Sequence, residues 1–235
     1  MSVGRRVLAE AFGTAALVFV GPGAAMLSAS TQVINHLGVS IAFGVIVALL
    51  VLLLGPISGA HINPAVTLTF WWMKRFPRRD VVPYVVAQCA GAMAAAFLLR
   101  ALLGDVGHVG ATIPSVSTVT AFIIEFAASA LLAFVIFALA SPRDIPALVP
   151  PLTIGATVFV GAYVTGPFTG GSFNPARSFG PAVASHTWTA HWIYWLAPIT
   201  GMLAGAQYAL RVRATRGTKR TGNGQRSEKQ QTRDH

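Results

Sequence analysis

Long apolar runs dominate the sequence and constrain its fold more than any other feature. Each is near the roughly 20 residues that a helix needs to cross the hydrocarbon core of a bilayer. The six runs cover residues 6–27, 36–55, 81–103, 119–140, 148–166 and 190–211. Only 10% of the residues are charged, whereas a soluble domain carries about a quarter. The sequence therefore predicts an all-α membrane protein with six transmembrane helices.

Two further segments, 63–73 and 174–184, are too short to span a bilayer, and each begins with Asn-Pro-Ala. Asn is a favoured N-cap and Pro is favoured at the first helical position, so each segment predicts a short helix that begins at Asn63 or Asn174. The Gly-rich loops ahead of them need burial or a water-filled cavity at membrane depth. We expect loop carbonyls to line such a cavity, namely those of Gly59, Ala60, His61, Gly170, Gly171 and Ser172.

The two halves of the chain form an internal repeat. LAEAFGTAALVFV resembles IIEFAASALLAFV, SGAHINPAVT resembles TGGSFNPARS, and AQCAGAMAAA resembles APITGMLAGA. Each copy holds three spans and one short helix, and an odd number of spans inverts the second copy in the membrane. The predicted units are a first repeat (1–104), an extracytoplasmic connection (105–118), a second repeat (119–211) and a disordered basic cytoplasmic tail (212–235).

The net charge of +10 is distributed unevenly along the chain. If alternate loops face alternate sides, 15 of the 17 Lys and Arg residues lie on one side, eight of them from Arg211 onward. This is the positive-inside pattern, and it predicts that both termini are cytoplasmic. The charge therefore indicates a bilayer as the partner and not a nucleic acid.

Inversion brings Asn63 and Asn174 face to face near the middle of the membrane. Each capping Asn uses its side-chain oxygen on the first-turn amides and keeps its NH2 group as a donor toward the cavity. A water between them accepts from both, so its hydrogens point away and a continuous proton relay is broken. The two helix N-termini also repel cations, because each carries about half a positive charge.

Two Asn-Pro-Ala motifs on inverted repeats, with Glu10 and Glu125 in the first span of each half, resemble the aquaporin (major intrinsic protein) family across residues 5–211. The resemblance implies a passive water channel that excludes protons and ions, needs no cofactor and is not an enzyme. It also implies a homotetramer in the inner or plasma membrane. The family's pore motifs correspond to Asn63, Pro64, Ala65, Asn174, Pro175 and Ala176.

The resemblance places the family's constriction at Phe43, Ala162, Gly171 and Arg177. Arg177 is disfavoured in the first turn of a helix and in lipid, and ionisable groups in membranes are functional by default. Water-selective members carry His at the position of Ala162, so this filter is predicted to be wide. Glycerol-type members have Asp and Lys at the positions of Ser178 and Ala182. These two residues, together with the pair Tyr194–Trp195, favour a bacterial-type water channel. A relaxed filter also admits small neutral solutes, and a glycerol or urea facilitator is the alternative.

The remaining polar residues are predicted to stabilise the structure around the pore. By resemblance, Glu10 and Glu125 accept hydrogen bonds from loop amides and brace the two Asn-Pro turns; the alternative is a proton-carrying pair in a transporter. His61 is expected to contribute its carbonyl, and Gln88 to brace the bundle. No His or Cys has metal-ligand spacing, so no metal site is predicted. A coupled secondary transporter shares inverted repeats and stays as a less favoured alternative.

Overall fold

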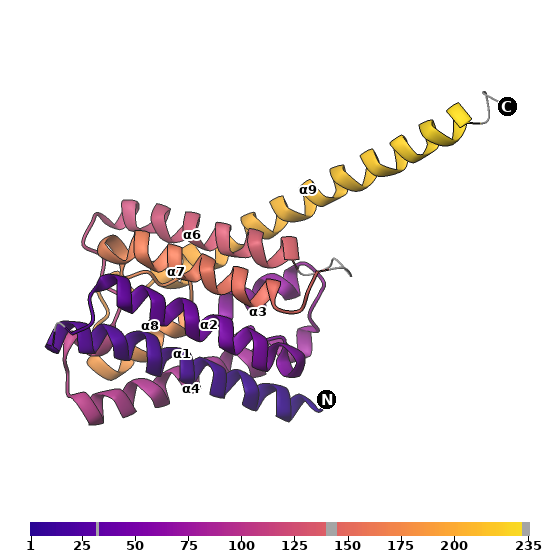
Figure 1. Ribbon diagram of the computed structural model, residues 1–235. Coiled ribbons are helices and arrows are strands. Elements are labelled where there is room, and N and C mark those ends of the chain that lie inside the picture. Colours follow the sequence, from indigo (N-terminus) through magenta and orange to yellow (C-terminus); the bar gives the residue numbers. More distant parts are fainter. Residues whose placement is uncertain (32, 140–144, 232–235) are drawn as a thin grey trace.

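The computed structural model describes residues 1–31, 33–139 and 145–231, and the regular structure within these ranges is helical (Figure 1). The order of two long helices, one short helix and one long helix occurs twice, which confirms the predicted all-α repeat architecture. The first half contains α1 (Val3–Thr31), α2 (His36–Ser58), α3 (Pro64–Trp72) and α4 (Arg78–Leu103). The short α5 (Gly107–Gly110) leads to α6 (Thr118–Leu139), α7 (Val149–Thr169), α8 (Pro175–Ser185) and α9 (Ile193–Gln231).

Five helices within the described ranges are long and apolar enough to cross a membrane, namely α1, α2, α4, α6 and α7. The sixth predicted span, 190–211, corresponds to the start of α9, which is not among the five. It nevertheless packs along α6 just as α4 packs along α1. The first part of α9 is therefore the counterpart of α4 in the second repeat.

Matching glycines allow these two helix pairs to approach closely. A Cβ atom on Gly91 of α4 would overlap the carbonyl oxygen of Ala11 in α1. At the equivalent place in the second repeat, a Cβ atom on Gly201 of α9 would overlap the carbonyl oxygen of Phe126 in α6. Small residues let helix backbones pack closely in membranes, where van der Waals contact drives association. The same close helix–helix contact at a glycine therefore occurs in both repeats.

The short helices pack across the repeat boundary. The half-helix α8 of the second repeat packs mainly on α4 of the first, and α3 of the first repeat packs mainly on α9 of the second. In addition, α2 packs along α7. This interleaving brings the N-termini of α3 and α8 to the same region of the bundle, where the two Asn-Pro-Ala motifs lie.

The N-terminus and the projecting part of α9 leave the bundle at the same end, on the right in Figure 1. At this end Arg6 forms an ion pair with Asp80 at 2.5 Å, and Nη1 of Arg213 donates to the carbonyl oxygen of Phe137 at 3.1 Å. Lys and Arg side chains commonly satisfy the last carbonyls of a helix in this way. The predicted cytoplasmic segments thus lie together.

The tail differs from its prediction. Residues 212–235 are predicted to be disordered, whereas in the structure α9 continues to Gln231; residues 232–235 lie outside the described residues. Arg, Lys, Gln and Glu are good helix formers, and extending an existing helix avoids the cost of nucleation. The predicted span 119–140 ends one residue beyond the described part of α6.

Candidate functional site

The loops ahead of α3 and α8 run in an unusual backbone conformation. Positive φ angles occur at Ala60 (47°) and Ile62 (42°) in the first loop and at Phe173 (49°) in the second, in addition to several glycines. A non-glycine residue with positive φ is strained and persists only where its surroundings determine it. In both loops, a buried carboxylate holds the backbone in this conformation.

Glu10, buried in α1, holds the first loop. Its Oε1 accepts from the backbone N–H of His61 at 2.9 Å and from the Ser58 hydroxyl at 2.7 Å. Its Oε2 accepts from the N–H of Ile62 at 2.6 Å and from the Gln88 side-chain amide at 2.7 Å. Hydrogen bonds to a charged acceptor are about twice as strong as neutral ones, so this carboxylate fixes the loop firmly.

Glu125, buried in α6, holds the second loop in the same manner. Its Oε1 accepts from the N–H of Ser172 at 2.9 Å and from the Thr169 hydroxyl at 2.6 Å. Its Oε2 accepts from the N–H of Phe173 at 2.9 Å. Ser58 and Thr169, His61 and Ser172, and Ile62 and Phe173 are equivalent by the repeat. The two carboxylates therefore have matching sets of three donors, and Gln88 is a fourth donor to Glu10 alone.

A pair of buried tyrosines completes the symmetry. The Tyr84 hydroxyl donates to the carbonyl oxygen of Ser58 at 2.8 Å, and the Tyr194 hydroxyl donates to that of Thr169 at 2.7 Å. Both side chains are fully buried. Tyr194, which in the sequence favours the water branch, thus supports the second loop and lines neither of the two cavities near these loops.

Asn63 and Asn174 cap α3 and α8. The Asn63 Oδ1 accepts from the N–H of Ala65 at 2.8 Å, and the Asn174 Oδ1 accepts from those of Ala176 at 3.0 Å and Arg177 at 3.3 Å. The N-caps and the first-turn prolines begin both helices where the sequence predicts. The side-chain oxygens therefore face the helices, and the NH2 groups face the opposite loop.

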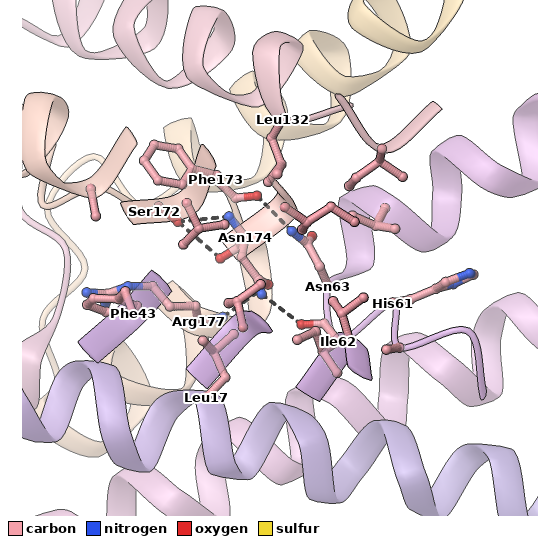
Figure 2. Close-up of a pocket in the computed structure, with 18 of the residues that line it drawn as sticks. Leu17, Phe43, His61, Ile62, Asn63, Leu132, Ser172, Phe173, Asn174 and Arg177 are labelled. Carbon is pink, nitrogen blue, oxygen red and sulfur yellow. Dashed lines mark hydrogen bonds between the residues drawn. The ribbon is translucent and has the colours of Figure 1, made fainter. Parts of the chain in front are cut away.

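Each Asn amide crosses to the other repeat, as Figure 2 shows. The Asn63 Nδ2 donates to the carbonyl oxygen of Phe173 at 2.8 Å, and the Asn174 Nδ2 donates to that of Ile62 at 2.7 Å. An amide NH2 carries two hydrogens, so one per Asn is left for another acceptor. This reciprocal link ties the two loops together and was not expected from the sequence, which predicts that the whole NH2 group faces the cavity.

A cavity of about 100 Å³ runs along these loops. Both capping Asn residues line it, and one wall is formed by apolar side chains of the long helices. The predicted pore residues in its lining are Phe43, Gly59, Ala60, His61, Asn63, Ala162, Gly171, Ser172, Asn174 and Arg177. The apolar residues in its lining include Leu17, Val47, Val51, Val66, Leu132, Ile136 and Val158. The lining thus combines polar groups from the loops with an apolar wall.

A second cavity of about 270 Å³ adjoins the first. Three residues line both cavities: Phe43, Ala162 and Arg177. Three of the four predicted filter residues therefore lie where the two spaces meet, and the fourth, Gly171, lines the first cavity alone. Gly170 lines only the second cavity, and Pro64, Ala65, Pro175 and Ala176 line neither. These last four residues build the helix starts.

Arg177 is held by groups from three directions. Its Cζ lies 4.9 Å from the centre of the Phe43 ring, within the range of a cation–π contact. Its Nη1 donates to the carbonyl oxygen of Gly110 at 2.9 Å, and its backbone N–H bonds to the Asn174 cap. Nε is buried and has no hydrogen-bond partner among the described residues. Donor capacity is therefore left on a guanidinium that lines both cavities.

His61 is tethered by its ring as well as by its backbone. Its Nδ1 lies 3.1 Å from Oγ1 of Thr67, and its ring stacks on Phe70 with 4.8 Å between the centres. Gln88 also donates to the Thr67 hydroxyl, at 3.0 Å. The sequence predicts a carbonyl contribution from His61; the structure adds an imidazole that is held by Thr67 and Phe70 and points away from Asn63 and Ile62 (Figure 2).

Two contributors to the site, Gly110 and Tyr84, were not predicted from the sequence. Both lie outside the motifs that they support, and no local pattern specifies their contacts with Arg177 and Ser58. The glycines in GDVGHVG are the one signal that could have suggested a tight backbone near the site. No group of three or more His, Cys, Asp or Glu residues in the described ranges could hold a metal ion.

Comparison with known proteins agrees with this geometry. The family described as "Major intrinsic protein" matches residues 1–208. Among similar curated proteins, "Aquaporin NIP2-2" of Zea mays is 42% identical over 205 residues, which cover 87% of this chain and 70% of the relative. "Nodulin-26" of Glycine max is 38% identical over 204 residues, which cover 86% and 75%. These plant relatives do not support placement in a bacterial-type water channel branch.

The fold is also found among solved structures. The X-ray structure of the aquaglyceroporin from Plasmodium falciparum aligns with a TM-score of 0.79 at 23% sequence identity. The alignment covers 88% of this chain and 95% of that one. The similarity extends over most of the chain and shows a common fold.

Proposed function

Because this chain belongs to the major intrinsic protein family, and is therefore a multi-pass membrane channel and not an enzyme, we propose that it conducts water passively along osmotic gradients. Small uncharged solutes pass by the same route. The observation that carries the proposal is the position of the filter. Phe43, Ala162 and Arg177 line both cavities, and Asn63 and Asn174 line the smaller one.

Exclusion of ions follows from the two helix starts. Each N-terminus carries about half a positive charge and, at ~4 Å and an effective dielectric constant of ~20, repels a monovalent cation by roughly 2 kcal/mol. Two starts together oppose cations by about 4 kcal/mol, which is close to a thousandfold. The Arg177 charge adds to this barrier, and an uncharged molecule does not experience it.

Exclusion of protons depends on the remaining hydrogen of each Asn amide. One hydrogen of Asn63 and one of Asn174 already bond across the repeat boundary. The second hydrogen of each is free to donate to a water oxygen in the cavity. A water that accepts from both directs its own hydrogens away, so a hydrogen-bonded chain of waters is interrupted there.

The width of the filter supports transport of neutral solutes as well as water. Ala162 and Gly171 contribute one methyl group and none, so Phe43 and Arg177 are the only bulky side chains among the four filter residues. A glycerol or urea facilitator is therefore the second candidate. The Zea mays relative carries an aquaporin name, which favours water as a permeant.

Membrane placement and assembly complete the proposal. The N-terminus and the basic part of α9 leave the bundle at one end (Figure 1), as a cytoplasmic location of both termini requires. The homotetramer in the plasma or inner membrane, implied by family resemblance, is proposed on that basis.

Osmotic shrinkage of reconstituted vesicles tests this function. We expect the protein to accelerate shrinkage over empty vesicles, with water, glycerol, urea and hydrogen peroxide compared side by side. Ala162→Trp fills the filter and should remove the acceleration. Val160→Trp places the same bulk on the exposed side of α7 and should not. Equal rates in protein-containing and empty vesicles would reject the channel, and saturation or ion-gradient dependence would favour a transporter.

A further inference from the structure

The connection between the repeats contains a left-handed turn. Four consecutive residues have positive φ: Gly107 (54°), His108 (52°), Val109 (56°) and Gly110 (69°). This conformation is unfavourable for non-glycine residues and most unusual for a β-branched one such as Val109. Strain of this kind is retained only where the surroundings impose it.

Burial imposes the turn on this segment. Val109 is fully buried and belongs to an apolar cluster that joins three helices. Its partners are Val18 and Met26 of α1, Ala92 and Leu99 of α4, and Ala176 and Ala184 of α8. The turn is therefore anchored to the same helix that carries Arg177.

Gly110 is pressed against α1. A Cβ atom on this residue would lie 2.8 Å from the Cβ and 2.9 Å from the Cα and carbonyl oxygen of Pro22. Real Cβ atoms do not approach so closely, and two of these atoms belong to the backbone, which cannot turn away. The location of Gly110 is thus set by Pro22 on one side and by buried Val109 on the other.

From this location the Gly110 carbonyl reaches the filter. It accepts from Nη1 of Arg177 at 2.9 Å, and this is the one side-chain hydrogen bond of that guanidinium in the described part of the chain. Two residues further on, the Thr112 hydroxyl donates to Oγ of Ser178, the neighbour of Arg177, at 2.8 Å. The connection therefore contacts the first turn of α8 twice.

We propose that Gly110 is a positioning residue for selectivity: the strained turn 107–110, wedged against Pro22, presents its carbonyl oxygen so that the Arg177 guanidinium stays fixed in the filter. The inference rests on the proposed channel function. Without this hydrogen bond the guanidinium would be held by the Phe43 ring alone and would sample several positions, and the barrier to charged species would vary with its position.

Gly110→Ala tests this role, because a methyl group at this φ is both strained and blocked by Pro22. The measured quantity is the ratio of cation leak to water permeability in vesicles with equal protein content. We expect Gly110→Ala to raise this ratio by about tenfold, the scale of a lost hydrogen bond to a charged group. Gly104→Ala is the matched control, since it has φ of 78° and no atom within 4 Å of the added methyl; its ratio should stay unchanged.

A double variant separates positioning from general damage. If Gly110 acts through Arg177, Gly110→Ala adds nothing to the ratio once Arg177→Val is present. A full additional effect in that background, or an unchanged ratio in Gly110→Ala, overturns the inference while the channel function stands. A wild-type protein that conducts no water would instead reject the channel function.

A second variant covers the case in which Gly110→Ala does not fold. His108 is exposed, and proline cannot adopt its φ of 52°. His108→Pro therefore disrupts the turn without adding a contact to α1, and it should raise the same ratio. An unchanged ratio in folded His108→Pro also overturns the inference.

Discussion

The guanidinium carbon of Arg177 lies 4.9 Å from the centre of the Phe43 ring, although 134 positions separate the two residues in the chain (177 − 43). Phe43 comes from α2 of the first repeat and Arg177 from α8 of the second. Together with Ala162 they line both cavities. The proposed filter is thus built from both repeats.

Ala162→His should convert a wide filter into a narrow one. The imidazole would enter the space between the two cavities, where Ala162 offers only a methyl group. We predict that glycerol and urea permeability falls by about tenfold, while water permeability falls much less, because a pocket rejects a solute that no longer fits. Stopped-flow measurement of both fluxes checks this. Unchanged solute flux would show that Ala162 does not face the permeation path.

Arg177→Val should weaken charge exclusion. Val66 occupies the equivalent position in the first repeat, so valine is compatible with the start of such a helix. Removing a buried positive charge from the filter lowers the barrier to cations, and we predict that cation leak rises by about tenfold or more. Arg177→Lys, which keeps the charge, is the control. A leak equal to that of the wild type would mean that the two helix starts alone exclude ions.

Gln88→Leu should be tolerated. Its loss leaves Glu10 with three donors, two backbone amides and one hydroxyl, which is the set that Glu125 has. We expect near wild-type water flux and a loss of about 2 kcal/mol in stability, because Gln88 makes two hydrogen bonds, one to Glu10 and one to Thr67, and each contributes about 1 kcal/mol. Glu10→Ala, in contrast, leaves buried amides unpaired and should abolish flux. If Gln88→Leu lowers water flux as much as Glu10→Ala does, then three donors are not enough for Glu10, and the two carboxylates are not equivalent.

Tyr84→Phe and Tyr194→Phe should have matching effects. Each removes one hydroxyl donor from a loop carbonyl and leaves the ring in place. We predict that each lowers stability by about 1 kcal/mol, which is about 2–4 °C in melting temperature for a chain of this size. Thermal unfolding in detergent measures both. Tyr208→Phe, on an exposed side chain, serves as the control. Clearly unequal losses would contradict the structural equivalence of the repeats.

Much of the fold follows from local patterns in the sequence. The lengths of the apolar runs predict the long helices, because a helix in lipid must satisfy its own backbone and span a fixed thickness. The helix starts at Asn63 and Asn174 follow from capping chemistry, which involves neighbouring residues only. The contacts around these helix starts do not follow from local patterns, because Glu10 binds loop residues that lie 48 or more positions away in the chain.

The tail and the connection were predicted least well. Residues 212–231 carry many charges and no apolar face, which predicts disorder, yet they continue the helix of α9. The connection 105–118 is predicted only as a linker, whereas the structure places its Gly110 carbonyl against the filter. No local pattern encodes such a contact, because it depends on how α1, α4 and α8 pack around Val109.

The sequence by itself determined the elements and their symmetry: membrane-length helices, two capped short helices, and a repeat whose odd number of spans inverts it. These are properties of neighbouring residues or of periodic patterns, so they can be read without knowing the packing. Only the tertiary structure decided how the repeats join, through the crossed amides of Asn63 and Asn174, and what fixes Arg177. Those contacts join residues from different helices, and their distances exist only once the bundle has packed.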